Sequence, residues 1–197
     1  RTFPGRRSDL KRIILREALA CFNEVGIEAT SIETIRARCD TSVGAIYHHF
    51  GNKEGLVAAL FFAALEDQAS LRDHYLQTAD TAHAGVVGLV YSYVEWVTEQ
   101  PDWARFVFQS RFAVSSGPFK EELLARNKQR NQQLKEWMSG EGRKEHFSHL
   151  PPELIPSLII GAAESYSRAW LSAKVKKSPF EYRELLAEAA WKSISLG

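Results

Sequence analysis

Apolar residues recur three and four positions apart along most of the chain, which is the period of an amphipathic α-helix. Between residues 10 and 25, for example, Ile14, Ala18 and Phe22 follow one another at intervals of four. Gly26 comes directly afterwards and suits the left-handed C-terminal end of a helix. No segment keeps the two-residue period of a β-strand, and no internal repeat is present. The pattern therefore predicts an all-α protein.

Two short helices are predicted next. The pair Thr30–Ser31 supplies N-cap oxygens for a helix that runs to about Arg38, and with Thr30 as the cap, Glu33 three residues later completes a capping box. A break at residues 39–41 precedes a second short helix over residues 42–49. The sequence thus predicts a helix-turn-helix in a three-helix N-terminal region.

The rest of the chain continues in helices without a flexible linker. Asn52 suits the cap of a fourth helix that leads directly into the 70s, and residues 141–150 are expected to form a loop. The later helices are expected from Asp80 or Thr81 to about residue 98, and at about residues 101–115, 118–138, 152–171 and 179–194. Together with the first four they make about nine helices, the later ones forming a helical bundle.

Composition is that of an ordinary globular protein. The chain has 197 residues, of which 45% are hydrophobic and 25% charged. No window approaches 18 uninterrupted apolar residues and the N-terminus lacks a signal-peptide pattern, so we expect a cytoplasmic protein with no membrane partner. Cys21 and Cys39 show no disulfide or zinc spacing and are expected to be buried thiols.

Charge is unevenly distributed although the net charge is only +1. Residues 1–16 hold six basic residues against Asp9 alone, which gives six minus one, or +5. The basic residues are Arg1, Arg6, Arg7, Lys11, Arg12 and Arg16. Such an arm could contact nucleic-acid phosphates, and the alternative is a solvated terminus.

The second short helix has the features of a helix that enters the DNA major groove. Val43, Gly44 and Ala45 are small enough for close approach. A glycine inside a helix costs about 0.5–1 kcal/mol relative to alanine, so Gly44 needs a reason such as contact with DNA. Ile46 and Phe50 would pack inward.

Several other residues are placed to contact DNA. Tyr47 and His48 would face outward, toward phosphates or base edges. Thr30 and Ser31 lie at a helix N-terminus, which favours a phosphate. The predicted DNA-binding residues are Thr30, Ser31, Arg36, Ser42, Val43, Gly44, Ala45, Tyr47, His48 and Lys53.

The segment resembles the TetR family of bacterial transcriptional regulators over roughly residues 10–65, about a third of the chain. Residues that match the family's pattern are Phe22, Gly26, Thr30, Ile35, Ser42, Gly44, Tyr47, Phe50, Lys53, Glu54 and Leu56. Departures from it are Arg36, Cys39, Asp40 and Thr41. Asp40 replaces a usual turn glycine, and aspartate tolerates left-handed backbone better than most residues.

The resemblance implies a division of labour along the chain. Residues 1–55 would form the DNA-binding domain, and residues 56–197 the effector-binding and dimerisation domain. The function implied is a ligand-responsive repressor that binds a palindromic operator in double-stranded DNA as a homodimer. The last two long helices would form the dimer interface, with Leu158, Gly161, Ala162, Ser165, Ala169, Leu185 and Ala189 as candidates. Ordinary core packing is the alternative for these residues.

Aromatic residues concentrated in the middle of the chain suggest a pocket for an apolar or amphipathic small molecule. Its candidate lining is Tyr93, Trp96, Trp103, Phe106, Phe108, Gln109, Trp137, Tyr166 and Trp170. For each aromatic the alternative is a place in the core.

Enzyme chemistry finds little support. The chain has no glycine-rich phosphate loop, nucleophile elbow or His-Glu-x-x-His motif. His146 and His149 lie in a polar segment without a third ligand, so we expect neither a metal nor a cofactor. A helical protein-interaction module is the rival to a DNA-binding protein, and binding of duplex DNA with a steep salt dependence would distinguish the two.

Overall fold

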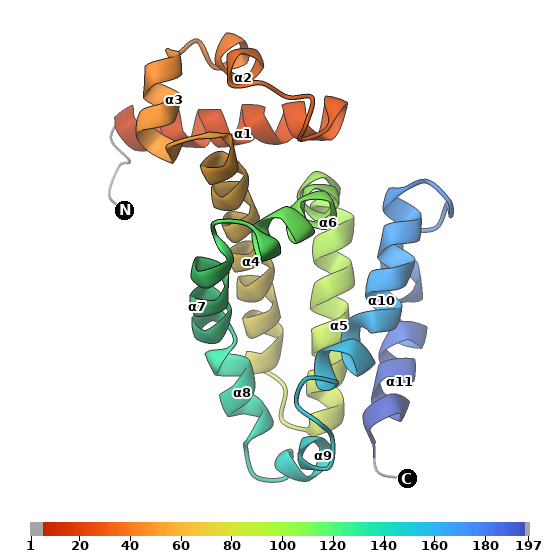
Figure 1. Cartoon of the computed structure of the whole chain (residues 1–197). Coiled ribbons are helices and arrows are strands. Elements are labelled where there is room, and N and C mark those ends of the chain that lie inside the picture. The colour runs from red at the N-terminus through yellow and green to blue at the C-terminus, as the bar shows by residue number, and fades with distance from the viewer. Residues whose placement is uncertain (1–5, 196–197) are drawn as a thin grey trace. The chain divides into compact units, whose positions relative to one another are not determined.

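The structure is a computed structural model that describes residues 6–195, with side chains described from residue 9 onward. The described chain is helical and contains no strand, which confirms the all-α prediction (Figure 1). The elements are α1 (Arg6–Val25), α2 (Ile32–Cys39), α3 (Val43–Phe50), α4 (Lys53–Gln77), α5 (Ala82–Glu99), α6 (Pro101–Ser116), α7 (Lys120–Arg130), α8 (Gln132–Met138), α9 (Lys144–Ser148), α10 (Ile155–Leu171), the 3-10 turn η1 (Pro179–Tyr182) and α11 (Arg183–Ile194).

The described residues form two compact units. The first contains residues up to 64 together with 102–124, and the second contains 65–101 together with the residues from 125 onward. Packing alone does not say which residues bind DNA or an effector. The functional division at residue 55 therefore stays a prediction.

The first unit contains the predicted helix-turn-helix, in which α2 packs against α1 and α3 packs against α2 (Figure 1). Ile35 and Ile46 are fully buried and Phe50 nearly so, which confirms that α3 turns its apolar side inward. Phe106 of α6 stacks on Phe22 of α1 with ring centroids 5.7 Å apart. This aromatic pair forms part of the core beneath the helix-turn-helix.

Of the two residues predicted to cap α2, the second is the one that does so. Ser31 is the N-cap, and its hydroxyl accepts a hydrogen bond from the backbone N–H of Thr34 at 3.0 Å. Thr30 is only 1% exposed and donates its hydroxyl to the carbonyl of Gly26 at 2.8 Å. Thr30 therefore closes the turn after α1 from inside, and the predicted capping box with Glu33 is wrong.

Three turns of the first unit have left-handed backbone. Gly26 has a φ of 89° and Gly51 a φ of 77°, each directly after a helix. Asp40 lies in the left-handed α region at φ 46° and ψ 48°, between α2 and α3. The expected conformations of Gly26 and Asp40 are confirmed.

In the second unit α5, α10 and α11 pack against one another (Figure 1). Val90 and Val94 of α5 meet Ile159 of α10 and Ile194 of α11 in one buried cluster. Gly85 of α5 is covered by the indole of Trp137, so closely that an added Cβ would lie 1.9 Å from the ring. The Trp137 N–H donates to the carbonyl of Ala79 at 3.1 Å. Trp137 is thereby fixed as a packing residue of this unit.

Three helix predictions need correction. The helix predicted over residues 118–138 is interrupted at Asn131, which has non-helical ψ of 5° and separates α7 from α8. Residues 141–150, predicted as a loop, contain the short helix α9. The last helix begins with the 3-10 turn η1, because Ser178 and Pro179 start it one turn before α11. The described chain thus has eleven α-helices where about nine were expected.

Both cysteines are buried in the first unit. Burial raises the pKa of the Cys21 thiol, and it raises the pKa of Cys39 to about 11. Within residues 6–195 no cluster of three His, Cys, Asp or Glu side chains could hold a metal ion. None of the helices described is both long and apolar enough to cross a membrane.

Candidate nucleic-acid interface

The outer face of α3 is open to solvent. Gly44 and His48 are exposed, and Tyr47 is 47% exposed, while Val43 and Ala45 are half-buried beside them. A Cβ added to Gly44 would have the Ser42 hydroxyl as its nearest neighbour, at 3.8 Å. Packing within the chain therefore does not require glycine at position 44, although glycine weakens a helix. Ser42 is the N-cap of α3 and accepts from the backbone N–H of Ala45.

Two of the predicted DNA-binding residues lie at the surface of α2. Ser31 is exposed at the N-terminus of the helix. Arg36 is partly exposed and donates to the carboxylate of Glu33 one turn earlier, at 2.8 Å. An exposed pair of this kind is weak enough for the guanidinium to exchange Glu33 for a phosphate.

The structure gives Thr30 and Lys53 a different place from the one predicted. The Thr30 side chain is buried, as described above. The Lys53 ammonium donates to the carbonyls of Ile27 at 2.9 Å, Thr30 at 3.1 Å and Glu28 at 3.3 Å. An ammonium has three N–H donors, so the carbonyls of the α1–α2 turn engage all of them. Both side chains hold this turn in position, and neither is free to meet a phosphate in this structure.

Replacing Lys53 with methionine tests this role. The change leaves three carbonyls without their charged donor, so we expect the free energy of unfolding to fall by about 1.5–3 kcal/mol. Urea denaturation measures the loss. Lys128→Met, at an exposed position of α7, is the control and should change stability by less than about 0.5 kcal/mol. Equal effects of the two variants would contradict a structural role for Lys53.

Sequence reasoning missed a contact between α1 and α2. The Arg38 guanidinium makes a two-pronged hydrogen bond with the Glu24 carboxylate, with Nη1 at 2.9 Å from Oε1. This pairing lowers the pKa of Glu24 and raises that of Arg38. The partners are 14 residues apart, so no helical spacing predicts them.

The basic N-terminal arm is described only in part. The side chains of Arg1, Arg6 and Arg7 lie outside the described residues. Those of Lys11, Arg12 and Arg16 are exposed on α1. Arg12 lies 3.8 Å from the Asp9 carboxylate, and Arg16 lies 2.9 Å from that of Glu17. Local pairing thus offsets part of the charge of this arm.

The predicted pocket residues are divided between the two units. Trp103, Phe106, Phe108 and Gln109 belong to the first unit, and Tyr93, Trp96, Trp137, Tyr166 and Trp170 to the second. Phe106 is fully buried against Phe22, so it is a core residue of the first unit. Trp96 is also buried, and its indole N–H donates to the Asp67 carboxylate at 2.9 Å.

A second polar pair inside the second unit was not predicted. The Tyr75 hydroxyl of α4 donates to the Glu95 carboxylate of α5. Burial, followed by this hydrogen bond, raises the pKa of Tyr75 to about 12. Neither this pair nor the pair of Asp67 and Trp96 could be predicted, because a single polar residue in a helical segment does not indicate its partner.

Most of the predicted interface residues of α10 and α11 lie at or near the surface. Leu185 is 70% exposed. Ala162, Ser165 and Ala189 are exposed, while Leu158, Gly161 and Ala169 are half-buried. Small and apolar side chains thus share the outer faces of two helices that pack side by side.

The fold and the exposed α3 define the chain as a helix-turn-helix protein with a second helical unit. Residues 14–60 match the family model described as bacterial regulatory proteins of the tetR family. The repressor AcnR of Corynebacterium glutamicum is 42% identical over 60 residues, which are 30% of each chain. The chain thus matches about three tenths of the length of its first curated relatives.

Solved structures extend the likeness to the whole fold. A TetR family transcription regulator from Marinobacter aquaeolei has a TM-score of 0.79 at 19% identity, covering 96% of this chain and 97% of that one. FadR from Bacillus subtilis, solved in complex with stearoyl-CoA, has a TM-score of 0.75 at 18% identity, covering 93% and 99%. Residues 14–60 thus resemble the tetR family of bacterial regulatory proteins, and the chain shares the fold of solved TetR family regulators.

Proposed function

We propose that the chain is a repressor that binds a palindromic operator as a homodimer and leaves it when a small-molecule effector binds. The observation that carries DNA binding is the exposed Gly44, which weakens α3 without any need from packing. Close approach of α3 to the base pairs would explain the glycine, because a helix with small outward residues can lie deeper in the major groove.

The exposed side chains around Gly44 divide by chemistry. Ser31 and Arg36 on α2, with Ser42 at the start of α3, are placed to meet phosphates. Tyr47 and His48, with Val43, Gly44 and Ala45, are the candidates for contact with base edges and thymine methyl groups. Thr30 and Lys53 position this surface through the α1–α2 turn.

Dimerisation and effector binding are assigned to the second unit. The exposed Leu185 and the small residues of α10 favour contact with the same helix faces of a second chain. An isologous dimer interface is formed in this way, by the same surface of both subunits. AcnR is named a repressor, and FadR of Bacillus subtilis holds an acyl-CoA, which supports repression and an amphipathic effector. Effector binding would change the separation of the two recognition helices, which must lie about 34–36 Å apart or a multiple of it.

Selection of bound sequences from random duplex DNA tests the proposal. Two identical recognition helices should enrich an inverted repeat, and the affinity should fall steeply with salt concentration. Enrichment of a single half-site would contradict the dimer. If no duplex is retained even at low ionic strength, the chain is a protein-interaction module and the proposal fails.

Replacing Tyr47 with alanine should weaken binding to the selected sequence. A lost base or phosphate contact costs about 1–3 kcal/mol, or roughly 5- to 150-fold in affinity, while a half-exposed position should change stability by less than about 0.5 kcal/mol. Fluorescence anisotropy with labelled operator measures the affinity. Phe112→Ala removes a ring that is 80% exposed on α6 and should leave the affinity unchanged. Tyr47 has no part in recognition if both variants bind like the wild type.

A further inference from the structure

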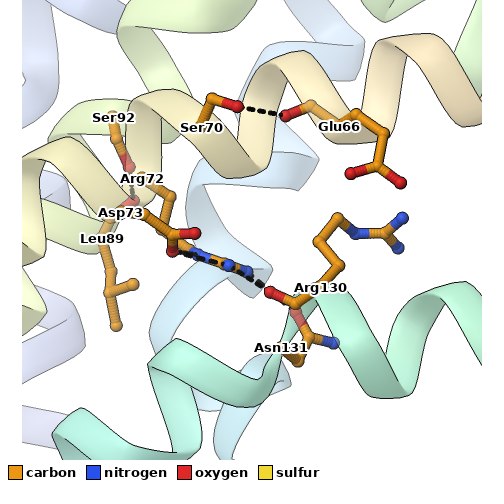
Figure 2. Close-up of polar contacts among 8 residues, drawn as sticks. All are labelled: Glu66, Ser70, Arg72, Asp73, Leu89, Ser92, Arg130 and Asn131. Atoms are coloured by element: carbon orange, nitrogen blue, oxygen red, sulfur yellow. Dashed lines mark hydrogen bonds and ion pairs between the residues drawn. The ribbon is translucent and has the colours of Figure 1, made fainter.

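A group of charged side chains lies between α4 and the α7–α8 junction in the second unit (Figure 2). Arg72 of α4 is only 7% exposed. Its guanidinium lies 2.7 Å from the Asp73 carboxylate and donates to the Asn131 side chain and to the carbonyl of Arg130, each at 2.8 Å. Arg72 is thus paired in charge and in hydrogen bonds, and it holds the chain where α7 ends.

Arg130 is a second partly buried arginine in the same place, and it is paired differently. Its Nη2 donates to the amide oxygen of Asn127, which carries no charge. Its Nη1 is buried and has no hydrogen-bond partner among the described residues. Figure 2 shows the Arg130 side chain reaching from α7 toward the side of α4 that carries Glu66.

Two carboxylates of α4 pair with the other two arginines. Asp73 pairs with Arg72 at 2.7 Å, and Glu66 lies 3.8 Å from Arg126. Burial lowers the pKa of Arg130, and the neighbouring Arg72 and Arg126 act in the same direction, against Glu66.

A buried guanidinium N–H without an acceptor is destabilising, and natural proteins retain such groups mainly where they have a use. A carboxylate or a phosphate fits the need, since its oxygens accept the charge-assisted hydrogen bonds of a guanidinium. We propose that Arg130, through its unpartnered Nη1, binds the anionic group of the effector. This inference rests on the proposed effector-controlled function.

Three probes with the same tail separate the possibilities. Dodecanoate carries a carboxylate, dodecyl phosphate carries a phosphate, and dodecanol is neutral. Calorimetric titration of the full chain should show at least one anionic probe binding about 10- to 100-fold more tightly than dodecanol, as charge-assisted hydrogen bonds predict. The ratio between dodecanoate and dodecyl phosphate then tells which anion the site takes.

Arg130→Met should remove this preference and leave dodecanol binding unchanged. Without any probe, the same variant should melt at a temperature equal to or higher than that of the wild type, because it removes the unsatisfied buried N–H. Arg72→Met is the matched control, and it should melt at a lower temperature because it breaks a satisfied network. A purely structural Arg130 would instead behave like Arg72.

Equal behaviour of the anionic probes and dodecanol toward the wild type, including no binding of any of them, would overturn the inference. So would an anion preference that survives in Arg130→Met. Neither result touches operator binding, which the selection from random DNA tests without any effector. If dodecanol released the operator as readily as the anionic probes do, that result would agree with an effector-controlled repressor but would contradict the anion site.

Discussion

Replacing Phe106 with alanine is expected to lower the free energy of unfolding by about 3–5 kcal/mol, the range for truncating a buried aromatic side chain. Phe106 is fully buried and stacks on Phe22 at 5.7 Å, so the variant loses both the apolar burial and the ring contact. The cavity would lie in the unit that contains α2 and α3. Urea denaturation followed by circular dichroism measures the loss, and operator binding should fail at the temperature where this unit unfolds.

Phe112→Ala on the same helix is the control, because that ring is exposed and its loss should cost less than about 0.5 kcal/mol. The sequence made Phe106 a candidate for an effector pocket, with a place in the core as the alternative. A residue that only lined a pocket would tolerate truncation with little loss of stability and a large loss of effector affinity. That result would restore the original assignment.

Replacing Gly44 with alanine or leucine is expected to make the protein more stable and a poorer DNA binder. Both residues favour a helix over glycine by roughly 0.5–1 kcal/mol, and space around position 44 is open. On DNA the added side chain would lift α3 from the groove. Losing one base contact of about 1–3 kcal/mol weakens binding by roughly 5- to 150-fold, and leucine should have the larger effect.

The opposite signs of these two effects make the result specific. Loss of DNA affinity through unfolding would go with lower stability, which the Gly44 variants should not show. Ala113→Leu, an exposed position of α6, controls for the added side chain and should leave operator affinity unchanged. If Gly44→Leu bound operator as tightly as the wild type, α3 would not be the helix that enters the groove.

Local patterns predicted most of the first unit. Helical spacing located the inward side of α3 at Ile46 and Phe50, and backbone preferences located the left-handed turns at Gly26 and Asp40. They placed the cap of α2 at the pair Thr30–Ser31 and could not choose between the two, because both residue types are good caps. Only the packing of Thr30 against the turn after α1 decides between them.

Contacts between distant residues could not be predicted in this way. Lys53 bonds carbonyls 23–26 residues earlier, and Arg38 pairs with a carboxylate 14 residues away. Asn131, where the predicted helix is interrupted, accepts a hydrogen bond from Arg72, which is 59 residues earlier. For the same reason the aromatic residues were grouped by their nearness in sequence, whereas the structure divides them between two units.

Because both cysteines are buried, their reactivity can be used to measure local opening of the protein. The chain has only two thiols, and both belong to the first unit. With a pKa of about 11 for Cys39, almost none of that thiol is ionised at neutral pH, so an aromatic disulfide reagent should modify it only when this part of the protein opens. The rate of thiol modification then measures how often the first unit opens. A bound operator should lower this rate without changing the reactivity of the reagent.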